Sequence, residues 1–104
     1  MRRGEVWWAD LPPPVGRRPV VLLSRDESYR VRSLVTVALM TTIIRHIPVE
    51  VSLGPGDGLS KLCVANLDTI LTLRKSQLTR VICSLQPEKI EQLNLALKFA
   101  LAIP

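Results

Sequence analysis

Histidine and cysteine are scarce in this 104-residue sequence, and each scarcity excludes a class of site. His46 is the only histidine, so two histidines cannot share the acid and base roles of a catalytic pair. Cys63 and Cys83 are too few for a disulfide scaffold, and with one histidine they make a poor set of metal ligands. We therefore expect reduced thiols and no metal site.

Long apolar segments are also missing. Arg2 and Arg3 are followed by Gly4, Glu5 and Asp10, which is not the sustained apolar segment of a signal peptide. The longest uncharged run of interest, Leu34 to Ile44, is far short of the ~20 residues that span a bilayer. These patterns predict a cytoplasmic protein without membrane contact.

The overall composition is that of a folded, basic protein. Apolar residues make up 47% and charged residues 22%, which fits one globular domain covering residues 1–104. Fourteen basic and nine acidic side chains give a net charge of +5, which attracts polyanions such as nucleic acid. The alternative, that the charge serves only solubility, stays open at this point.

Alternation and β-branched residues predict a series of short strands joined by turns. The expected strands are Glu5–Asp10, Pro19–Ser24, Ser33–Thr42, Ile47–Leu53, Lys61–Asn66 and Thr69–Leu73. The polar segment Asp26–Arg32 is expected to be irregular. Gly54–Gly58 lacks the Gly-Lys-Ser/Thr ending of a phosphate loop and predicts a plain turn.

A single helix is expected near the end of the chain, from about Pro87 to Ala102, because proline suits a first helical turn. Its core stripe is predicted to consist of Ile90, Leu93, Leu97 and Leu101. A second apolar line of Leu95, Phe99 and Ala102 fits either a partner surface or deep burial. The elements together predict a mainly β fold, a small, strongly bent barrel with the C-terminal helix packed across it.

Two adjacent arginines are the strongest candidates for chemistry. Arg17 and Arg18 precede Pro19, which fixes the backbone at the start of an apolar strand, and guanidinium groups held in this way suit phosphate. RNA carries its own nucleophile, the 2′-hydroxyl, so charge stabilisation alone can support its cleavage. Equally, the two arginines can be part of a solvated loop.

Other residues have both a functional and a structural interpretation. His46 suits a general base near neutral pH, but its place after Arg45 in a predicted connection favours a surface position. Trp7 and Trp8 suit base stacking, and at least one of them is expected in the core. Cys63 and Cys83 are expected as buried small apolar residues.

Several segments together resemble the MazF/PemK (Kid) toxin family. They are Arg3 to Leu11, Gly16 with Arg18 to Ser24, Val37 to Thr42, Val64 to Leu73, and Leu78 to Ile103. The first two resemble the opening signature of the family, and the third resembles its strand that ends in a threonine. The fourth resembles its acidic segment before the last strand, and the fifth its terminal leucine-rich helix.

This resemblance implies a CcdB/MazF-type fold related to SH3 barrels, and the toxin of a type II toxin–antitoxin system. It implies a homodimer that cleaves single-stranded RNA without a metal, to a cyclic phosphate and a 5′-hydroxyl, and that a MazE-like antitoxin inhibits. Arg18 and Thr41 fall on the family's central catalytic pair, and Asp68 on an acidic residue implicated in catalysis. Arg17, Thr42 and Trp8 are expected to bind RNA.

The chain departs from the family pattern in its first loop, which passes from Gly16 directly to Arg17 without the Gly-x-Glu element of many relatives. Two other functions fit a small basic barrel. One is a non-enzymatic CcdB-like gyrase poison, which needs no phosphate-facing Arg18 and Thr41. The other is a basic RNA-binding barrel that leaves RNA intact.

Overall fold

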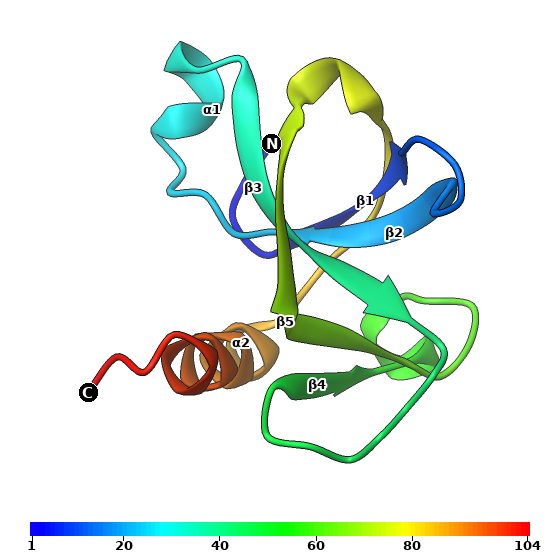
Figure 1. The fold of residues 1–104 in the computed structure, drawn as a ribbon, viewed down its shortest axis with the longest axis vertical. Coiled ribbons are helices and arrows are strands. Elements are labelled where there is room, and N and C mark those ends of the chain that lie inside the picture. The colour runs from blue at the N-terminus through cyan, green and yellow to red at the C-terminus, as the bar shows by residue number, and fades with distance from the viewer.

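The computed structural model describes all of residues 1–104 and consists of one curled antiparallel sheet and a C-terminal helix (Figure 1). The strands are β1 (Glu5–Asp10), β2 (Arg17–Leu22), β3 (Leu34–Thr41), β4 (Glu50–Leu53), β5 (Cys63–Arg74) and β6 (Leu78–Ser84). The helices are the one-turn α1 (Ser28–Val31) and the longer α2 (Pro87–Ala100), with short 3-10 turns at Pro55–Asp57 and Lys75–Gln77. The predicted fold class is confirmed.

The sheet order is β4-β5-β3-β2-β1-β6, so β4 and β6 form its two edges. β5 is the longest strand and bends where its pairing with β3 shifts, since Ala38 pairs with Ile70 but Leu39 pairs with Asn66. The extra residues at this shift form a bulge, which increases local twist and bends the sheet. The two strands expected at Lys61–Asn66 and Thr69–Leu73 are therefore one bent strand.

Three predicted elements need correction. Leu78–Ser84 is strand β6, not the start of a leucine-rich helix, because Thr79, Val81 and Ile82 favour a strand. The helix begins at Pro87 and ends at Ala100, since Ala102 adopts a positive φ of 55°. The segment expected to be irregular, Asp26–Arg32, contains α1.

Buried side chains form two clusters on the two faces of the curled sheet. The larger cluster includes Val6, Met40 and Leu67 and is covered by α2 through Leu93 and Ala96. The smaller cluster packs Val20, Val37 and Leu73 around the buried Tyr29. Its other members are Ala9, Leu22, Val35 and Leu78. Both faces of β1, β2 and β3 are therefore apolar over most of their length, and polar residues concentrate at the strand ends.

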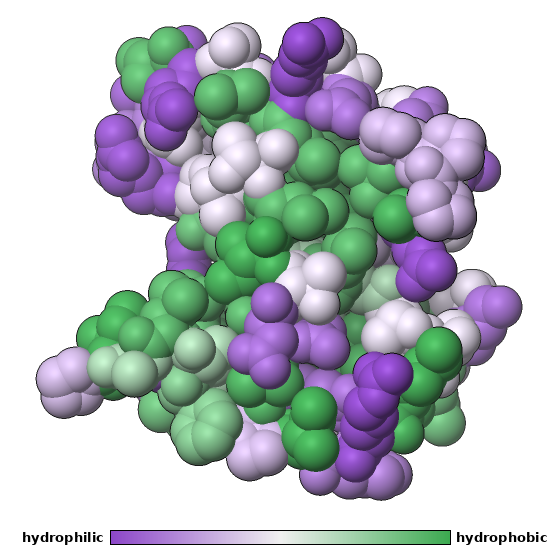
Figure 2. Space-filling model, in the orientation of Figure 1, coloured by the Kyte–Doolittle hydropathy of each residue, from purple (hydrophilic) through white to green (hydrophobic).

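Helix α2 leaves one apolar face uncovered. Leu95 and Phe99 on α2 are more than half exposed, at 59% and 63%, and Leu101, which follows the helix, is 55% exposed. Figure 2 shows green surface at the lower left, over α2 and the C-terminal end. The prediction of Leu101 as a core residue is wrong, and the second apolar line is on the surface. Neither helix is both long and apolar enough to cross a membrane.

Candidate functional site

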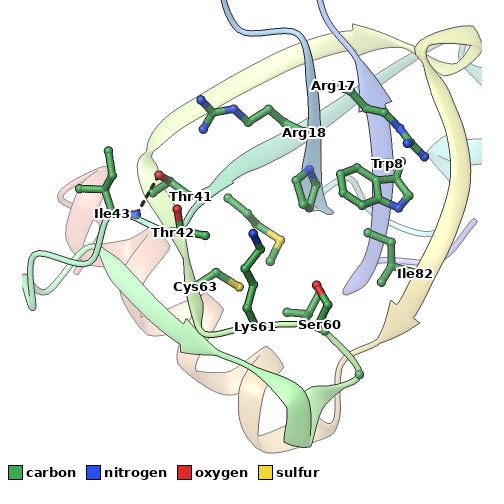
Figure 3. A pocket seen from close by; sticks show the side chains of 14 residues that line it. Trp8, Arg17, Arg18, Thr41, Thr42, Ile43, Ser60, Lys61, Cys63 and Ile82 are labelled. Atoms are coloured by element: carbon green, nitrogen blue, oxygen red, sulfur yellow. Dashed lines mark hydrogen bonds between the residues drawn. The ribbon is translucent and has the colours of Figure 1, made fainter.

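A cavity of about 690 Å³ opens where the ends of β1, β2 and β3 face the segment between β4 and β5 (Figure 3). Its walls come from distant parts of the sequence, and they are formed by Trp8, Arg17, Arg18, Pro19, Met40, Thr41, Thr42, Ile43, Gly58, Leu59, Ser60, Lys61, Cys63 and Ile82. Five of the six predicted site residues are in this set. The curl of the sheet has brought them together.

Arg18 and Thr41 lie near the ends of neighbouring strands. β2 and β3 are antiparallel, and Val20 pairs with Leu39. The pairing ends there, and two residues further along each strand are Arg18, near the start of β2, and Thr41, at the end of β3. Both side chains lie at the same rim of the cavity in Figure 3. A guanidinium group and a hydroxyl group can therefore bind the same phosphate.

The hydroxyl group of Thr41 is already oriented by the backbone. Its oxygen accepts a hydrogen bond of 3.1 Å from the N–H of Ile43, which follows the strand end. A hydroxyl group has one proton to donate, and this contact leaves it unused. Thr41 can thus donate to an anionic oxygen in the cavity.

Arg17 diverges from Arg18, because neighbouring residues of a strand point to opposite faces. Its guanidinium carbon lies 4.4 Å from the ring centroid of Trp8, within cation–π range. Trp8 is half-buried and lines the cavity, whereas Trp7 packs against the smaller core cluster and donates its indole N–H to Glu5 at 3.0 Å. Of the two tryptophans, Trp8 is therefore the one available for a ligand.

The charge of the cavity wall is entirely positive. Arg17, Arg18 and Lys61 line it, and its other lining residues are uncharged. Lys61 and its neighbour Ser60 are not among the residues predicted from the sequence, because a lysine beside a turn has no distinguishing pattern of its own. The only available signal was its position just after the glycine-rich turn.

Asp68 does not line this cavity. It is exposed in the bulge of β5, where its backbone N–H donates to the side-chain oxygen of Asn66 at 2.9 Å. In this contact the Asn66 side chain bonds the backbone two residues further on, as asparagine side chains commonly do in turns. His46 is also exposed and outside the cavity wall, with a positive φ of 56°.

The cysteine that lines the cavity is a neutral thiol near pH 7. Burial, with the carboxylate of Asp57 second, raises the pKa of Cys63 above its usual value. The pKa of Cys83 is raised for the same reasons, and both residues are free cysteines. Nucleophilic attack requires the thiolate, so Cys63 is a poor nucleophile at this position. No three side chains of histidine, cysteine, aspartate or glutamate gather anywhere in the structure.

Comparison with known proteins identifies the class of toxin to which this architecture belongs. The profile of the family described as PemK-like, MazF-like toxin of type II toxin–antitoxin systems matches residues 2–101. The chain belongs to this family. It is 36% identical over 99 residues to a probable endoribonuclease MazF5 of Mycobacterium tuberculosis, covering 94% of this chain and 90% of the relative. It is 32% identical over 111 residues to endoribonuclease EndoA of Bacillus subtilis, covering 99% and 96%.

Solved structures agree with this assignment. A mycobacterial endoribonuclease in complex with its cognate antitoxin is 33% identical, with a TM-score of 0.88 over 100% of this chain and 97% of the other. The Mycobacterium tuberculosis toxin MazF-mt6 is 28% identical, with a TM-score of 0.89 over 96% and 98%. These relatives do not favour the gyrase poison or the non-cleaving RNA-binding barrel.

Proposed function

We propose that this chain is a toxin endoribonuclease that cleaves single-stranded RNA in the cytoplasm and is inhibited by a MazE-like antitoxin. The observation that carries the proposal is the placement of Arg18 and Thr41 at one rim of a cavity whose charged residues are all positive (Figure 3). Family membership and the names of the relatives support the reaction. The two free thiols support the compartment, because disulfides are rare in the reducing cytosol.

In this proposal the 2′-hydroxyl of the RNA gives its proton to a base, for which Asp68 is the candidate considered below, and its oxygen attacks the adjacent phosphorus. The bond to the 5′-oxygen of the next nucleotide then breaks, leaving a 2′,3′-cyclic phosphate and a 5′-hydroxyl. Arg18 stabilises the negative charge of the phosphorane with its paired N–H donors and gives a proton to the leaving oxygen. Thr41 donates its free hydroxyl proton to a phosphate oxygen, and no metal takes part.

The neighbouring residues hold the RNA in place. The Arg17 guanidinium group lies over one face of the Trp8 ring and adds positive charge. The other face of the ring is available for a base to stack on. Thr42 is exposed beside Thr41 and supplies a further hydroxyl group. We take residues 1–104 to act as one toxin domain, because both core clusters share a single sheet.

Arg18→Ala tests the central role. Loss of one charge-stabilising donor is expected to lower the cleavage rate by ~10²–10³-fold. The assay follows the ends of a defined single-stranded RNA, with and without EDTA, and Arg74→Ala is the charge-matched control at the far end of β5. Equal cleavage by wild type and Arg18→Ala would refute the assignment, and loss of wild-type cleavage in EDTA would refute metal independence.

We further propose that Asp68 orients or deprotonates the 2′-hydroxyl. Since Asp68 does not line the cavity of its own chain, this role requires a second copy, in line with a homodimer. Arg18→Ala and Asp68→Asn subunits are each expected to be inactive alone. Mixed after unfolding and refolding, they should regain about a quarter of wild-type activity, since half of the dimers then contain one intact site. An active Asp68→Asn homodimer would exclude the role.

An acidic, extended antitoxin segment fits the same surface. The cavity offers positive charge, and β4 and β6 are sheet edges that can pair with an added strand.

The exposed face of α2 supports the homodimer, because a single chain leaves it open to water.

A further inference from the structure

The segment that carries Lys61 is held firmly against the sheet. Two backbone hydrogen bonds close the turn that precedes Lys61. The N–H of Asp57 donates to the carbonyl oxygen of Gly54 at 2.9 Å, and the N–H of Gly58 donates to the carbonyl oxygen of Pro55 at 3.1 Å. The carboxylate of Asp57 also accepts the N–H of Gly54 at 3.0 Å. Leu59 then enters the larger core cluster, with 8% of its surface exposed. The backbone before Lys61 is therefore anchored on both sides of the turn.

Lys61 differs from Lys75 and Lys89 in what its amine contacts. The amines of Lys75 and Lys89 donate to the main-chain oxygens of Tyr29 and Ser52. Lys61 is exposed, and Figure 3 shows its amine standing in the middle of the cavity, on the wall across from Arg18. A positive charge is thus directed into the site from the side that neither arginine covers.

We propose that Lys61 binds the RNA phosphate next to the scissile one, so that the strand crosses the cavity between the Arg18–Thr41 rim and this amine. The proposal rests on the function proposed above and adds a positioning residue to it. An ammonium group suits this task because it attracts a phosphate without the fixed bidentate geometry of a guanidinium group. Lys61 then stabilises bound RNA equally in the ground state and in the transition state. Its loss should therefore weaken RNA binding but have little effect on the cleavage rate of the bound complex.

The test measures binding separately from cleavage. A single-stranded RNA with a 2′-deoxy group at the cleaved nucleotide cannot react, and its Kd is measured over a range of salt concentrations. For Lys61→Ala we expect the Kd to rise about five- to tenfold and the slope of log K against log salt to fall by ~0.7, the value of one phosphate contact in a single strand. Lys61→Arg should retain most of the wild-type affinity and most of the wild-type salt slope.

Arg74→Ala is the control for net charge. Arg74 pairs with Leu34, seven residues along β3 from Thr41, so it lies about 23 Å from the rim of the cavity. Its loss changes the net charge by the same amount as Lys61→Ala, and its salt slope should match that of wild type. Saturating single-turnover rates on the all-ribose RNA should agree within about twofold for wild type and Lys61→Ala.

Two outcomes would overturn the proposal. One is a Lys61→Ala variant with the affinity and salt slope of wild type, and the other is an unchanged affinity with a large loss of the saturating rate. These are distinct from failure of the proposed function, which would appear as wild-type protein that leaves the all-ribose RNA intact. Even then, the salt slope on the unreactive RNA decides whether Lys61 contacts phosphate.

Discussion

At the scale of single residues, Thr41 has its hydroxyl oxygen occupied by a backbone donor and its proton free. The contact with the N–H of Ile43 fixes the hydroxyl group at the strand end, in the wall of the cavity that Arg18 also lines. Such a fixed donor loses little freedom when a phosphate binds, which is the condition for efficient charge stabilisation.

Thr41→Val keeps the shape of the side chain and removes the donor. We expect cleavage of single-stranded RNA to slow by about 10²-fold, while Thr41→Ser remains within about tenfold of wild type because it retains the hydroxyl group. Single-turnover rates compare the three proteins. A valine variant as fast as wild type would show that the hydroxyl group has no part in the reaction.

Tyr29 is a buried titratable residue far from the proposed chemistry. Burial, followed by the carboxylate of Asp26, raises the pKa of Tyr29 from 10.0 to about 12. Its hydroxyl group donates to the main-chain oxygen of Ser24 at 2.9 Å. Because the folded pKa is above the unfolded one, the associated stability is present below pH 10 and is lost as the pH rises towards 12.

This shift predicts the alkaline sensitivity of the fold. The two-unit rise corresponds to about 2–3 kcal/mol of unfolding free energy, lost progressively between pH 10 and 12. Tyr29→Phe should be less stable than wild type by about 1 kcal/mol at neutral pH, from the missing hydrogen bond, and should lose less stability over the alkaline range. Denaturant titrations at several pH values compare the two proteins, and parallel pH profiles would contradict the shift.

At the scale of elements, the turn between β4 and β5 determines where one wall of the cavity lies. Gly58 adopts a φ of +101°, and a Cβ atom placed there would lie 2.8 Å from the Cβ of Cys83 on β6. Both the backbone conformation and the close approach require glycine. The turn that follows β4, one edge of the sheet, therefore packs directly against β6, the other edge.

Gly58→Ala is expected to destabilise the fold by about 1–3 kcal/mol, because it adds backbone strain and a contact that must be relieved. Gly56→Ala is the matched control, since a Cβ atom at Gly56 meets nothing within 4 Å and its φ is not in the left-handed region. Thermal unfolding measures both variants. Equal melting temperatures for the two would show that the turn tolerates a side chain at either position.

At the scale of the whole molecule, the curl of one sheet has two consequences. It gathers the ends of β1, β2 and β3 at the cavity, and it leaves α2 covering only the larger core cluster. The outer face of α2, with Leu95 and Phe99, remains exposed in the single chain. We assign this face to the proposed homodimer.

Leu95→Glu places a charge in that face and should shift the protein from dimer to monomer without unfolding it, because the side chain is already 59% exposed within the chain. Ser76→Glu adds the same charge at an exposed position outside α2, in the turn between β5 and β6, and should leave the dimer intact. Sedimentation velocity reports the mass of each protein. A Leu95→Glu variant that remains dimeric would place the interface elsewhere.

Local sequence was enough to predict β1, β2, β3 and the start of α2, because alternation, β-branched residues and Pro87 act within a few residues. It did not predict β6. Resemblance to a leucine-rich helix obscured the local preference of Thr79, Val81 and Ile82, and their pairing with β1 is a long-range contact. The bulge in β5 was predicted as a turn for a similar reason, since its strand continuity depends on β3.

The sequence by itself determined the basic charge, the strand-forming segments and the Arg-Pro element that resembles the toxin family. Only the tertiary structure decided that Arg18 and Thr41 share one rim, that Arg17 turns to Trp8 and that Lys61 forms the opposite wall. It also left Asp68 outside the cavity wall. The physical reason is that register and sheet curvature result from packing between distant segments, which no local pattern contains.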